Sequence, residues 1–559
     1  MKWRYPLVFI ALVFFFVCVI ARLFYWQVVK AEMLSELAQS QYNGIIRVLP
    51  RRGEIKTSDG FSLAANKVSY LLFINPTAIK DKKYTVNILS SLLDLPAASV
   101  SSKIVPEKLW VPVQSGLDAK KKEEIERIHI PGVGFEEQYS RFYPEASTAA
   151  HLVGFVGKNE SGQDKGYVGL EGFYDRLLRG KDGYAVEFHD ALGRPILSKR
   201  IDRTNGSDGG NLFMSIDRSV QFLAEQKLKD GIERYGALGG MVGIMDPAAG
   251  DIVAMASFPS YSPQKYWEYD ESLYTNPFIT NTYEPGSTLK PIIMASALDA
   301  GIITPQTKCD ICGGPVNVSD YDLHTWNDKY YKDTNMIEVI QHSDNTGMVF
   351  VALKLGVDKM ISYLTRFGIG SLTDIDLQGE IAPSFKPRSA WYDVDLATTG
   401  FGQGISVTPI ELLSAFSGLA NEGKIMQPRV VKAFENANGE TLKIPVKVKG
   451  TPISAKTAKV MTEILVNAVE KGEAQWTKLK GYRIAGKTGT ASIPVAGHYD
   501  PKNTITSFIG FAPADKPKFA MLVILNKPTS SIYAAETAAP LFFDIAKDLL
   551  SYYGIPPSE

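Results

Sequence analysis

The sequence predicts an α+β protein with an N-terminal membrane-anchor helix, an intermediate domain of short strands and helices, and a C-terminal antiparallel sheet flanked by helices. Three observations lead to this architecture. The N-terminus is strongly apolar, a turn-rich break lies at residues 203–211, and beyond that break strands are followed by helices and then by strands again. The chain has 559 residues, which is enough for about two to four domains with a large core.

The N-terminal segment has the length and composition of a membrane span. It is apolar over residues 5–21 and, beyond Arg22, continues to Val29, and about 20 apolar residues cross a bilayer. No small-residue cleavage site follows the apolar run, so we expect an uncleaved anchor rather than a signal peptide. Lys2 and Arg4 favour a cytoplasmic N-terminus, but basic residues also follow the span, so charge alone leaves the orientation open.

The segment RTNGSDGGN, residues 203–211, is rich in turn-forming residues and is the best candidate for a linker. Beyond it the sequence becomes more apolar and glycines recur at intervals. The predicted division is therefore a cytoplasmic tip and anchor over residues 1–29, a second domain over 30–205 and a third over 212–559.

The third domain contains the clearest secondary-structure patterns. Two strands are expected around a turn at residues 247–250, and three strands and a closing helix are expected near the C-terminus. These last four segments are residues 482–491, 506–513, 518–525 and 537–554. Between the two groups of strands, an apolar run predicts a buried helix that starts at Ser287, contains Pro291 in its first turn and ends before Gly301.

The composition argues against nucleic acid as a partner and against a disulfide scaffold. Lys and Arg together number 60, as do Asp and Glu, so the formal net charge is zero and no basic excess is present. The cysteines are Cys18, Cys309 and Cys312, too few for a framework of disulfides.

Two of these cysteines raise the question of a metal. Cys309, Cys312, His324 and His342 fall within one short window, and a tetrahedral zinc ion accepts such ligands. The simpler interpretation is a local disulfide, or two free thiols in a loop. We favour the simpler interpretation and assign no metal to the site.

The stretch EPGSTLKP, residues 284–291, places Ser287 three residues before Lys290. Serine before an apolar helical run is a favoured N-cap, worth about 1 kcal/mol, so a cap is the ordinary interpretation of Ser287. The spacing is also a weak motif, because Ser262 and Lys265 form a second copy that nothing else supports. A role for Ser287 in catalysis therefore needs evidence from elsewhere in the chain.

Two downstream motifs supply that evidence. HSDNTG contains Ser343, Asp344 and Asn345, and GKTGT contains Lys487 to Thr490. S-x-x-K, S-D-N and K-T-G, in this order, form the motif set of serine enzymes that act on β-lactams and D-alanyl peptides. Each motif alone is weak, but all three together, at a helix start, a loop and a strand, indicate a serine acyltransferase with Ser287 as its nucleophile.

The chemistry explains these residue types. Serine needs a base, and Lys290 lies on the same helical face as Ser287, within reach of its hydroxyl. Lysine is a base only when neutral, and burial and a second cation, Lys487, lower its pKa. Ser343 can pass a proton between the lysines and the leaving amine, and Asn345 can hold a substrate amide. No cofactor is required.

The K-T-G segment is expected on an edge strand, to which a peptide substrate adds as an extra strand. Gly489 would let the backbone approach the substrate, and Thr488 and Thr490 offer hydroxyls to a terminal carboxylate beside the charge of Lys487. Backbone N–H groups of Ser287 and Thr490 would form the oxyanion hole, in which each donor lowers the barrier by about 3 kcal/mol. Ser343 and Asn345 face the substrate in this arrangement, so the side chain of Asp344 between them should point away.

The sequence resembles the class B penicillin-binding proteins, monofunctional D,D-transpeptidases of peptidoglycan synthesis, over nearly its whole length. Its anchor and the following RRGEIKTSDGFSLA resemble the family, as do HLVGFVG and GLEGFYDRLLRGKDG in the elongated pedestal domain. EPGSTLKP, GFGQGISVTPIEL, AGKTGTA and SFIGFAP resemble the transpeptidase domain, and the closing helix is more similar to the cell-division type than to the elongation type.

This resemblance implies a function. The donor would be a stem peptide ending in D-Ala-D-Ala, Ser287 would form an acyl-enzyme with release of D-Ala, and an amine of a neighbouring stem peptide would complete the cross-link. β-Lactams would acylate the same serine. The resemblance also implies a cytoplasmic N-terminus with catalysis outside the membrane. Because no glycosyltransferase domain is recognisable, it implies a SEDS-family polymerase and membrane proteins of the division machinery as partners.

Three other functions share this motif set. A β-lactamase needs a way to hydrolyse the acyl-enzyme, and it needs neither an anchor nor a pedestal. A β-lactam sensor should carry more membrane spans and a signalling module. A non-catalytic scaffold would usually lack Ser287, Lys290 or Lys487, and all three are present.

Overall fold

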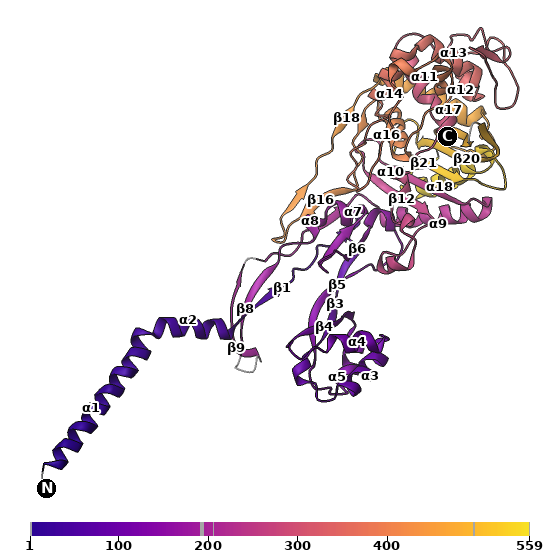
Figure 1. Cartoon of the computed structure of the whole chain (residues 1–559). Helices are drawn as coiled ribbons and strands as arrows, with labels where there is room; N and C mark the ends of the chain where they lie inside the picture. Colours follow the sequence, from indigo (N-terminus) through magenta and orange to yellow (C-terminus); the bar gives the residue numbers. More distant parts are fainter. Residues whose placement is uncertain (1–2, 190–194, 205, 496–497, 558–559) are drawn as a thin grey trace. The chain divides into compact units, whose positions relative to one another are not determined.

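The computed structural model describes residues 3–189, 195–204, 206–495 and 498–557. By its internal contacts the chain divides into two units (Figure 1). The first consists of Met1–Arg51 and Gly180–Gly209, and the second of Arg52–Arg179 and Gly210–Glu559. The predicted boundaries at residues 30–205 and 212–559 stay a prediction.

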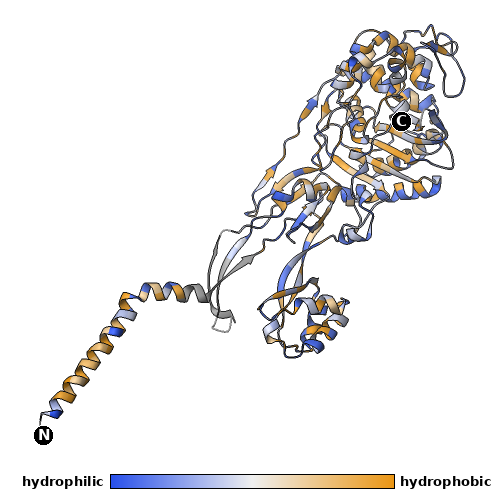
Figure 2. Cartoon of the chain, viewed as in Figure 1, coloured by the Kyte–Doolittle hydropathy of each residue, from blue (hydrophilic) through white to orange (hydrophobic). Residues whose placement is uncertain are grey.

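The first unit contains the anchor and a small sheet. Helix α1 (Arg4–Phe24) continues through a π-helical turn (Tyr25–Val29), and together they form a helix of 26 residues with no buried side chains and an 18-residue stretch whose mean hydropathy is 2.9. Its apolar character is plain in Figure 2, and its length and composition are those of a membrane span. Helix α2 and a three-stranded antiparallel sheet follow. These elements are α2 (Ala31–Tyr42), β1 (Asn43–Val48), β8 (Gly183–His189) and β9 (Pro195–Thr204).

The predicted linker at residues 203–211 is paired with neighbouring chain: before Asn205, which lies outside the described residues, Arg203 and Thr204 pair with β8. Ser207 O accepts a hydrogen bond from Lys181 N at 2.8 Å, and Gly209 N donates to Arg51 O at 2.8 Å. The segment is turn-rich, as expected, but it is fixed by backbone pairing rather than being a free connection. The bonds bring together the end of the first segment of this unit, at Arg51, and the two ends of its second segment, Gly180–Gly209.

The second unit begins with a small α+β layer. A long strand, β3, pairs with β4 and β5, and three short helices cover one side of these strands around a core that includes Leu72, Leu89 and Ile125. Asp81 and Asp118 cap two of these helices through their side chains. The elements are β3 (Ser62–Ile74), α3 (Lys82–Leu93), α4 (Ala97–Lys103), β4 (Val111–Leu117), α5 (Ala119–Glu126) and β5 (Val133–Phe142).

A buried ion-pair cluster joins the start of this unit to its later helices. Glu171, which is fully buried, accepts from Arg52 Nε at 2.7 Å and from Arg141 Nε at 2.6 Å, and Arg52 also pairs with Asp175 at 2.9 Å. Buried charges persist only when they are paired in this way. The short elements around the cluster are β2 (Ile55–Lys56), α6 (Ala150–Val153), β6 (Phe155–Lys158), β7 (Asp164–Tyr167), α7 (Gly169–Phe173) and α8 (Asp175–Leu178).

The core of the second unit is a five-stranded antiparallel sheet in the order β12-β11-β21-β20-β19, with β19 at the edge. Both faces are buried. Along β21, Met521, Val523 and Leu525 pack in one hydrophobic cluster, while Ala520, Leu522 and Ile524 pack in the other. The strands are β11 (Gly239–Met245), β12 (Ile252–Phe258), β19 (Ala485–Val495), β20 (His498–Ala512) and β21 (Phe519–Asn526).

Helices cover both faces of this sheet. The first cluster is closed by α9 (Arg218–Tyr235) and α18 (Ala538–Tyr552), which contact each other (Figure 1). The second is closed by a larger group that includes α16 and α17, which pack on β21 and β19. That group comprises α10 (Pro277–Thr280), α11 (Lys290–Asp299), α12 (Met336–Gln341), α13 (Asn345–Leu355), α14 (Val357–Arg366), α15 (Asp393–Gly400), α16 (Pro409–Ala420) and α17 (Ala455–Lys471).

A second sheet ties the catalytic part of the unit to its N-terminal layer. Strand β10 pairs in parallel with β2 and antiparallel with β16, so one sheet runs from β17 to β4. The remaining strands are β10 (Asn211–Met214), β13 (Val316–Val318), β14 (Tyr321–Leu323), β15 (Ile425–Met426), β16 (Val431–Glu435), β17 (Thr441–Lys443) and β18 (Val448–Gly450).

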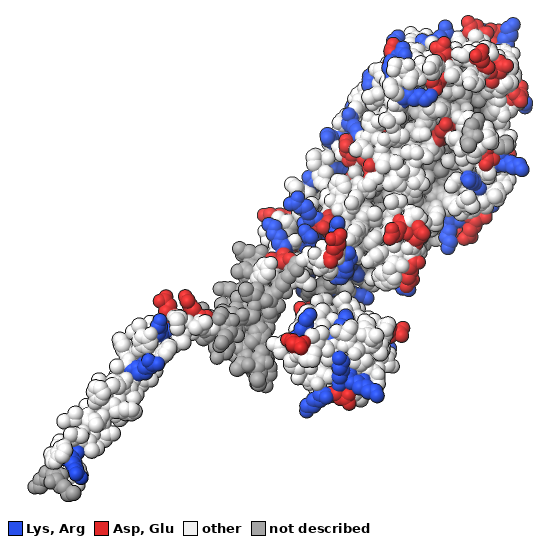
Figure 3. All heavy atoms as spheres, in the orientation of Figure 1, with Lys and Arg blue, Asp and Glu red and all other residues white. Residues whose placement is uncertain are grey.

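The antiparallel sheet flanked by helices confirms the predicted fold class. The hairpin of β11 and β12, the strands β19 to β21 and the closing helix α18 all lie where their patterns indicated. On the visible face of the molecule, basic and acidic side chains are interspersed (Figure 3), in keeping with the zero net charge.

Candidate active site

Ser287 lies in a short 3-10 turn, Gly286–Thr288, directly before α11. The predicted helix start at Ser287 is wrong, because α11 begins at Lys290. The alternative of an N-cap is also not met, since neither the 3-10 turn nor α11 has a side-chain capping bond. The turn is held from outside: Gly286 N donates to Gly402 O at 3.0 Å. A Cβ on Gly402 would lie 2.0 Å from Gly286 O, so only glycine allows the two loops to approach this closely.

Lys290 is fully buried beneath this turn. Its Nζ donates to Ser343 O at 2.6 Å, to Asn345 Oδ1 at 2.8 Å and, at 3.4 Å, to Ser343 Oγ. Burial, together with the positive charge of Lys487, lowers the pKa of Lys290 to about 7. The lysine is therefore neutral in a large fraction of molecules near neutral pH, as a general base must be.

Ser343 lies between Ser287 and the two lysines. Its Oγ is hydrogen-bonded to Ser287 Oγ at 3.0 Å and accepts from Lys487 Nζ at 2.9 Å. We expected Lys290 to contact the Ser287 hydroxyl directly. In the described part of the chain the two side chains are not hydrogen-bonded, because Lys290 donates to Ser343 and Asn345 instead. The positive φ of Ser343, 53°, turns its side chain out of the preceding helix toward Ser287.

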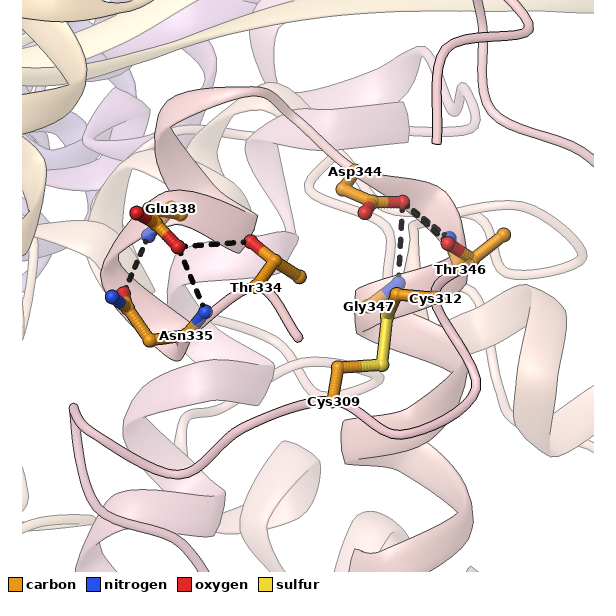
Figure 4. Close-up of a disulfide and its surroundings, with 8 residues drawn as sticks. All are labelled: Cys309, Cys312, Thr334, Asn335, Glu338, Asp344, Thr346 and Gly347. Carbon is orange, nitrogen blue, oxygen red and sulfur yellow. Dashed lines mark hydrogen bonds between the residues drawn. A yellow bond between two sulfur atoms is a disulfide. The ribbon is translucent and has the colours of Figure 1, made fainter. Parts of the chain in front are cut away.

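Asp344 points away from the site, as predicted. Its Oδ1 accepts from Thr346 N at 2.8 Å, Thr346 Oγ1 at 2.7 Å and Gly347 N at 3.2 Å, so the side chain caps α13 (Figure 4). The acid of the S-D-N motif thus fixes the start of the helix that carries Asn345. The Asn345 amide is itself oriented, since its Nδ2 donates to His324 O at 3.0 Å while its Oδ1 accepts from Lys290.

The K-T-G segment lies on the edge strand β19, which confirms the predicted position. Lys487 is buried, and its Nζ donates to Thr488 Oγ1 at 2.9 Å as well as to Ser343. Burial lowers the pKa of Lys487, and the negative charge of Glu473 opposes this shift. Thr490 is exposed, and its hydroxyl oxygen accepts from Ala534 N at 3.1 Å.

Gly489 has a packing role within the protein itself. A Cβ there would lie 2.5 Å from Ser507 Oγ and 2.6 Å from Thr288 Cγ2. The missing side chain therefore lets β19 approach the Gly286–Thr288 turn and the neighbouring strand β20, and the expected approach to a substrate stays a prediction.

The predicted residues line one cleft of about 870 Å³. Ser287, Ser343 and Asn345 contribute to its wall, as do Thr488 and Thr490 of β19, while the two lysines are buried beneath the surface. The aromatic rings of Trp326 and Tyr533, in edge-to-face contact, also line it. By contrast, Lys265 of the second S-x-x-K copy is exposed and pairs with Glu268, and neither Ser262 nor Lys265 lines this cleft.

The zinc hypothesis is wrong, because Cys309 and Cys312 are joined by a disulfide (Figure 4). Both cysteines are buried, and Cys309 N donates to Thr334 O at 2.9 Å. His324 is hydrogen-bonded to the hydroxyl of Tyr330, and the ring of His342 stacks on that of Tyr331. In the described part of the chain, no three His, Cys, Asp or Glu side chains are grouped to hold a metal ion.

Glu473 also lines the cleft and is not among the predicted site residues. Glu473 follows α17 and accepts a hydrogen bond from Thr488 Oγ1 at 2.9 Å. The segment GEA around it matches no motif, and only the packing of α17 against β19 brings it to the K-T-G strand.

Comparison with known proteins agrees with this geometry. Residues 240–548 match the penicillin binding protein transpeptidase domain, and residues 47–214 match the penicillin-binding protein dimerisation domain. The chain belongs to the class B penicillin-binding proteins. It is of the cell-division type and is a peptidoglycan D,D-transpeptidase.

Individual relatives cover 92% or more of this class B protein. It is 33% identical to stage V sporulation protein D of Bacillus subtilis over 97% of this chain and 85% of the relative. It is 27% identical to peptidoglycan D,D-transpeptidase FtsI of Escherichia coli strain K12, over 100% of this chain and 93% of the relative. The solved structure of a peptidoglycan synthetase from Bifidobacterium adolescentis shares its fold, with a TM-score of 0.74 at 24% identity over 92% and 98% of the two chains.

Proposed function

We propose that Ser287 is the nucleophile with which this D,D-transpeptidase forms its acyl-enzyme. The observation that carries the proposal is the hydrogen-bonded set at the base of the cleft, in which Ser343 contacts Ser287, Lys290 and Lys487. All four side chains come from three separate motifs, and each supplies a group that acyl transfer requires.

In the first half of the reaction, Ser287 Oγ attacks the penultimate carbonyl carbon of a stem peptide ending in D-Ala-D-Ala. Its proton passes through Ser343 to neutral Lys290, and the developing negative charge on the carbonyl oxygen is stabilised by backbone N–H groups of Ser287 and Thr490. When the C–N bond breaks, the proton returns to the leaving D-Ala amine. The products of this step are free D-Ala and an ester on Ser287.

In the second half, an amine of a neighbouring stem peptide attacks the ester carbonyl. The amine loses a proton to the same lysine and serine relay, the Ser287 Oγ–C bond breaks, and Ser287 regains its proton. Asn345 and β19 position the peptide, with Thr488 and Thr490 directed to its terminal carboxylate. In the first half, the amide bond of a β-lactam ring takes the place of the scissile peptide bond. The resulting ester on Ser287 is then not transferred to an acceptor amine.

Among the described residues one helix, Arg4–Val29, is long and apolar enough to span a membrane, as in a single-pass membrane protein. We propose that residues 1–3 lie in the cytoplasm and the catalytic domain outside, an orientation supported by Lys2 and Arg4 before the span. A SEDS-family glycosyltransferase and membrane proteins of the division machinery are the proposed partners, since a transpeptidase of this class needs glycan strands made by another protein.

Covalent labelling with a fluorescent penicillin tests the nucleophile. Ser287→Ala should abolish labelling while the thermal unfolding transition is retained, because the substitution removes one oxygen from a turn held by backbone bonds. Ser262→Ala is the matched control, because it alters the second S-x-x-K copy outside the cleft, and it should label fully. Labelling of the Ser287 variant at full strength would end the proposal.

A further inference from the structure

Glu473 brings a carboxylate into the place where the substrate's own carboxylate is expected. The residue lies at the end of α17, and its side chain lines the same cleft as Ser287 and Thr488. A Cβ on the preceding Gly472 would lie 2.3 Å from Ala468 O and 2.8 Å from Gln341 O, so the chain turns tightly at that position. The turn directs Glu473 toward β19 rather than along the helix axis.

The hydrogen bond of Glu473 uses the one proton that Thr488 can offer. A threonine hydroxyl has a single O–H donor and two acceptor lone pairs. Thr488 Oγ1 accepts from Lys487 Nζ at 2.9 Å and donates to Glu473 Oε2 at 2.9 Å. An incoming carboxylate that accepts this proton must therefore displace Glu473 from it.

Glu473 is also a separate negative charge rather than half of an ion pair. Among the described residues it has no Lys, Arg or His partner within salt-bridge distance, and its hydrogen bond is to a neutral hydroxyl. It lies near both buried lysines, whose pKa values its charge raises. A carboxylate placed here repels the carboxylate of an incoming ligand. It also offsets the positive charge of the two buried lysines, which would otherwise attract that ligand.

We propose that Glu473 is a specificity-determining residue that occupies the substrate-carboxylate position of the free enzyme and selects against anionic ligands that bind poorly elsewhere in the cleft. The proposal rests on the proposed function of Ser287 and Thr488. A long stem peptide has further contacts along β19 to offset the displacement, whereas a small anionic β-lactam has few. The residue thus distinguishes ligands by their carboxylate and by the rest of their contacts.

The test compares a charged ligand with its neutral counterpart. Second-order rate constants for acylation of the full-length, detergent-solubilised protein are measured with benzylpenicillin and with benzylpenicillin methyl ester. Glu473→Gln keeps an acceptor for Thr488 but removes the charge. It should raise the ratio of the benzylpenicillin rate constant to the ester rate constant about five- to tenfold, as expected for loss of one nearby like charge.

The matched control is Glu470→Gln, which removes the same charge one helical turn earlier, at an exposed residue that does not line the cleft. This variant should leave the ratio unchanged. An equal change in both variants, or no change in the Glu473 variant, would overturn the proposal. The proposed nucleophile is tested separately with two single variants. Ser287→Ala should lose acylation by both ligands, whereas Ser262→Ala should keep it.

A second readout separates this role from one of merely holding Thr488 in place. With the neutral ester, the acid limb of the pH profile should move to lower pH in Glu473→Gln, because the charge that raises the pKa of Lys290 is gone. Loss of a purely structural contact would lower both rate constants to the same extent and leave their ratio unchanged. That result would contradict the proposal.

Discussion

At the scale of single residues, the site depends on the protonation of one lysine. Lys290 has three acceptors around its Nζ, which favour the charged form, and complete burial beside Lys487, which favours the neutral form. The second influence is larger, and the pKa is about 7. A base with such a pKa accepts a proton from serine and returns it to a leaving amine at similar cost.

Acylation should therefore lose its base as the pH falls through 7. Lys290 is inactive as a base when protonated, and the protonated fraction grows below its pKa, so the acylation rate constant should fall about tenfold per pH unit in that range. Stopped-flow measurement of acylation from about pH 5 to pH 9 would show the limb. Lys290→Ala should acylate at a rate lower by orders of magnitude without a limb near pH 7, whereas a near-normal rate would assign the base elsewhere.

The sequence predicted the identity of these residues better than their contacts. The three motifs predicted that Ser287, Lys290, Ser343 and Lys487 meet, and in the structure Ser343 contacts the other three side chains. Which of these side chains contact each other could not be predicted. The helix α11 starts only at Lys290, and the side chain of Lys290 reaches Ser343 rather than Ser287. Glu473 could not be found at all, since its position depends on how α17 packs against β19.

At the scale of secondary-structure elements, the approach of β19 to the nucleophile turn decides the geometry of the cleft. Thr288 donates its hydroxyl proton to Pro285 O at 2.6 Å, which fixes the direction of its methyl group toward Gly489. The edge of the sheet and the start of α11 are therefore in contact through one glycine and one threonine. The sequence predicted the strand and the serine, but the contact between them required the tertiary structure.

Gly489→Ala should separate these two elements. The new methyl group would overlap Thr288 and Ser507, both fully or almost fully buried, so we expect a loss of about 1–3 kcal/mol in stability and a larger loss in acylation rate. Thermal unfolding and penicillin labelling of the same preparation measure the two effects. Gly450→Ala is the control, since the nearest atom to its Cβ is Arg366 O at 3.4 Å. Normal acylation by Gly489→Ala would show that the contact does not shape the site.

At the scale of the whole molecule, the catalytic residues and the anchor belong to different units. Every motif residue lies in the second unit, whereas the membrane-spanning helix and α2 lie in the first. The anchor helix has no buried residues, so its removal exposes no core.

Truncation of residues 1–29 should accordingly give a protein that is soluble without detergent and acylates at the rate of the full chain. Sedimentation of the extract and kinetics of penicillin labelling are the measurements. A folded truncation with a circular dichroism spectrum like that of the parent domains but with no labelling would show that the anchor contributes to the site.

The fate of the acyl-enzyme separates the transpeptidase from a β-lactamase that carries the same motifs. Both form an ester on Ser287, but a β-lactamase must then activate water with a positioned base. The acid within the motifs, Asp344, is directed to the start of α13, and Glu473, an acid that lines the cleft, is hydrogen-bonded to Thr488 of β19. Neither carboxylate is hydrogen-bonded to Ser287 among the described residues, so the ester should survive for many minutes after penicillin is removed, with negligible hydrolysis of the drug. Intact-protein mass spectrometry over that time should show the added mass persisting, with Ser287→Ala as the unlabelled reference. Return to the unmodified mass within seconds, together with steady hydrolysis of penicillin, would contradict the assignment of this site to transpeptidation.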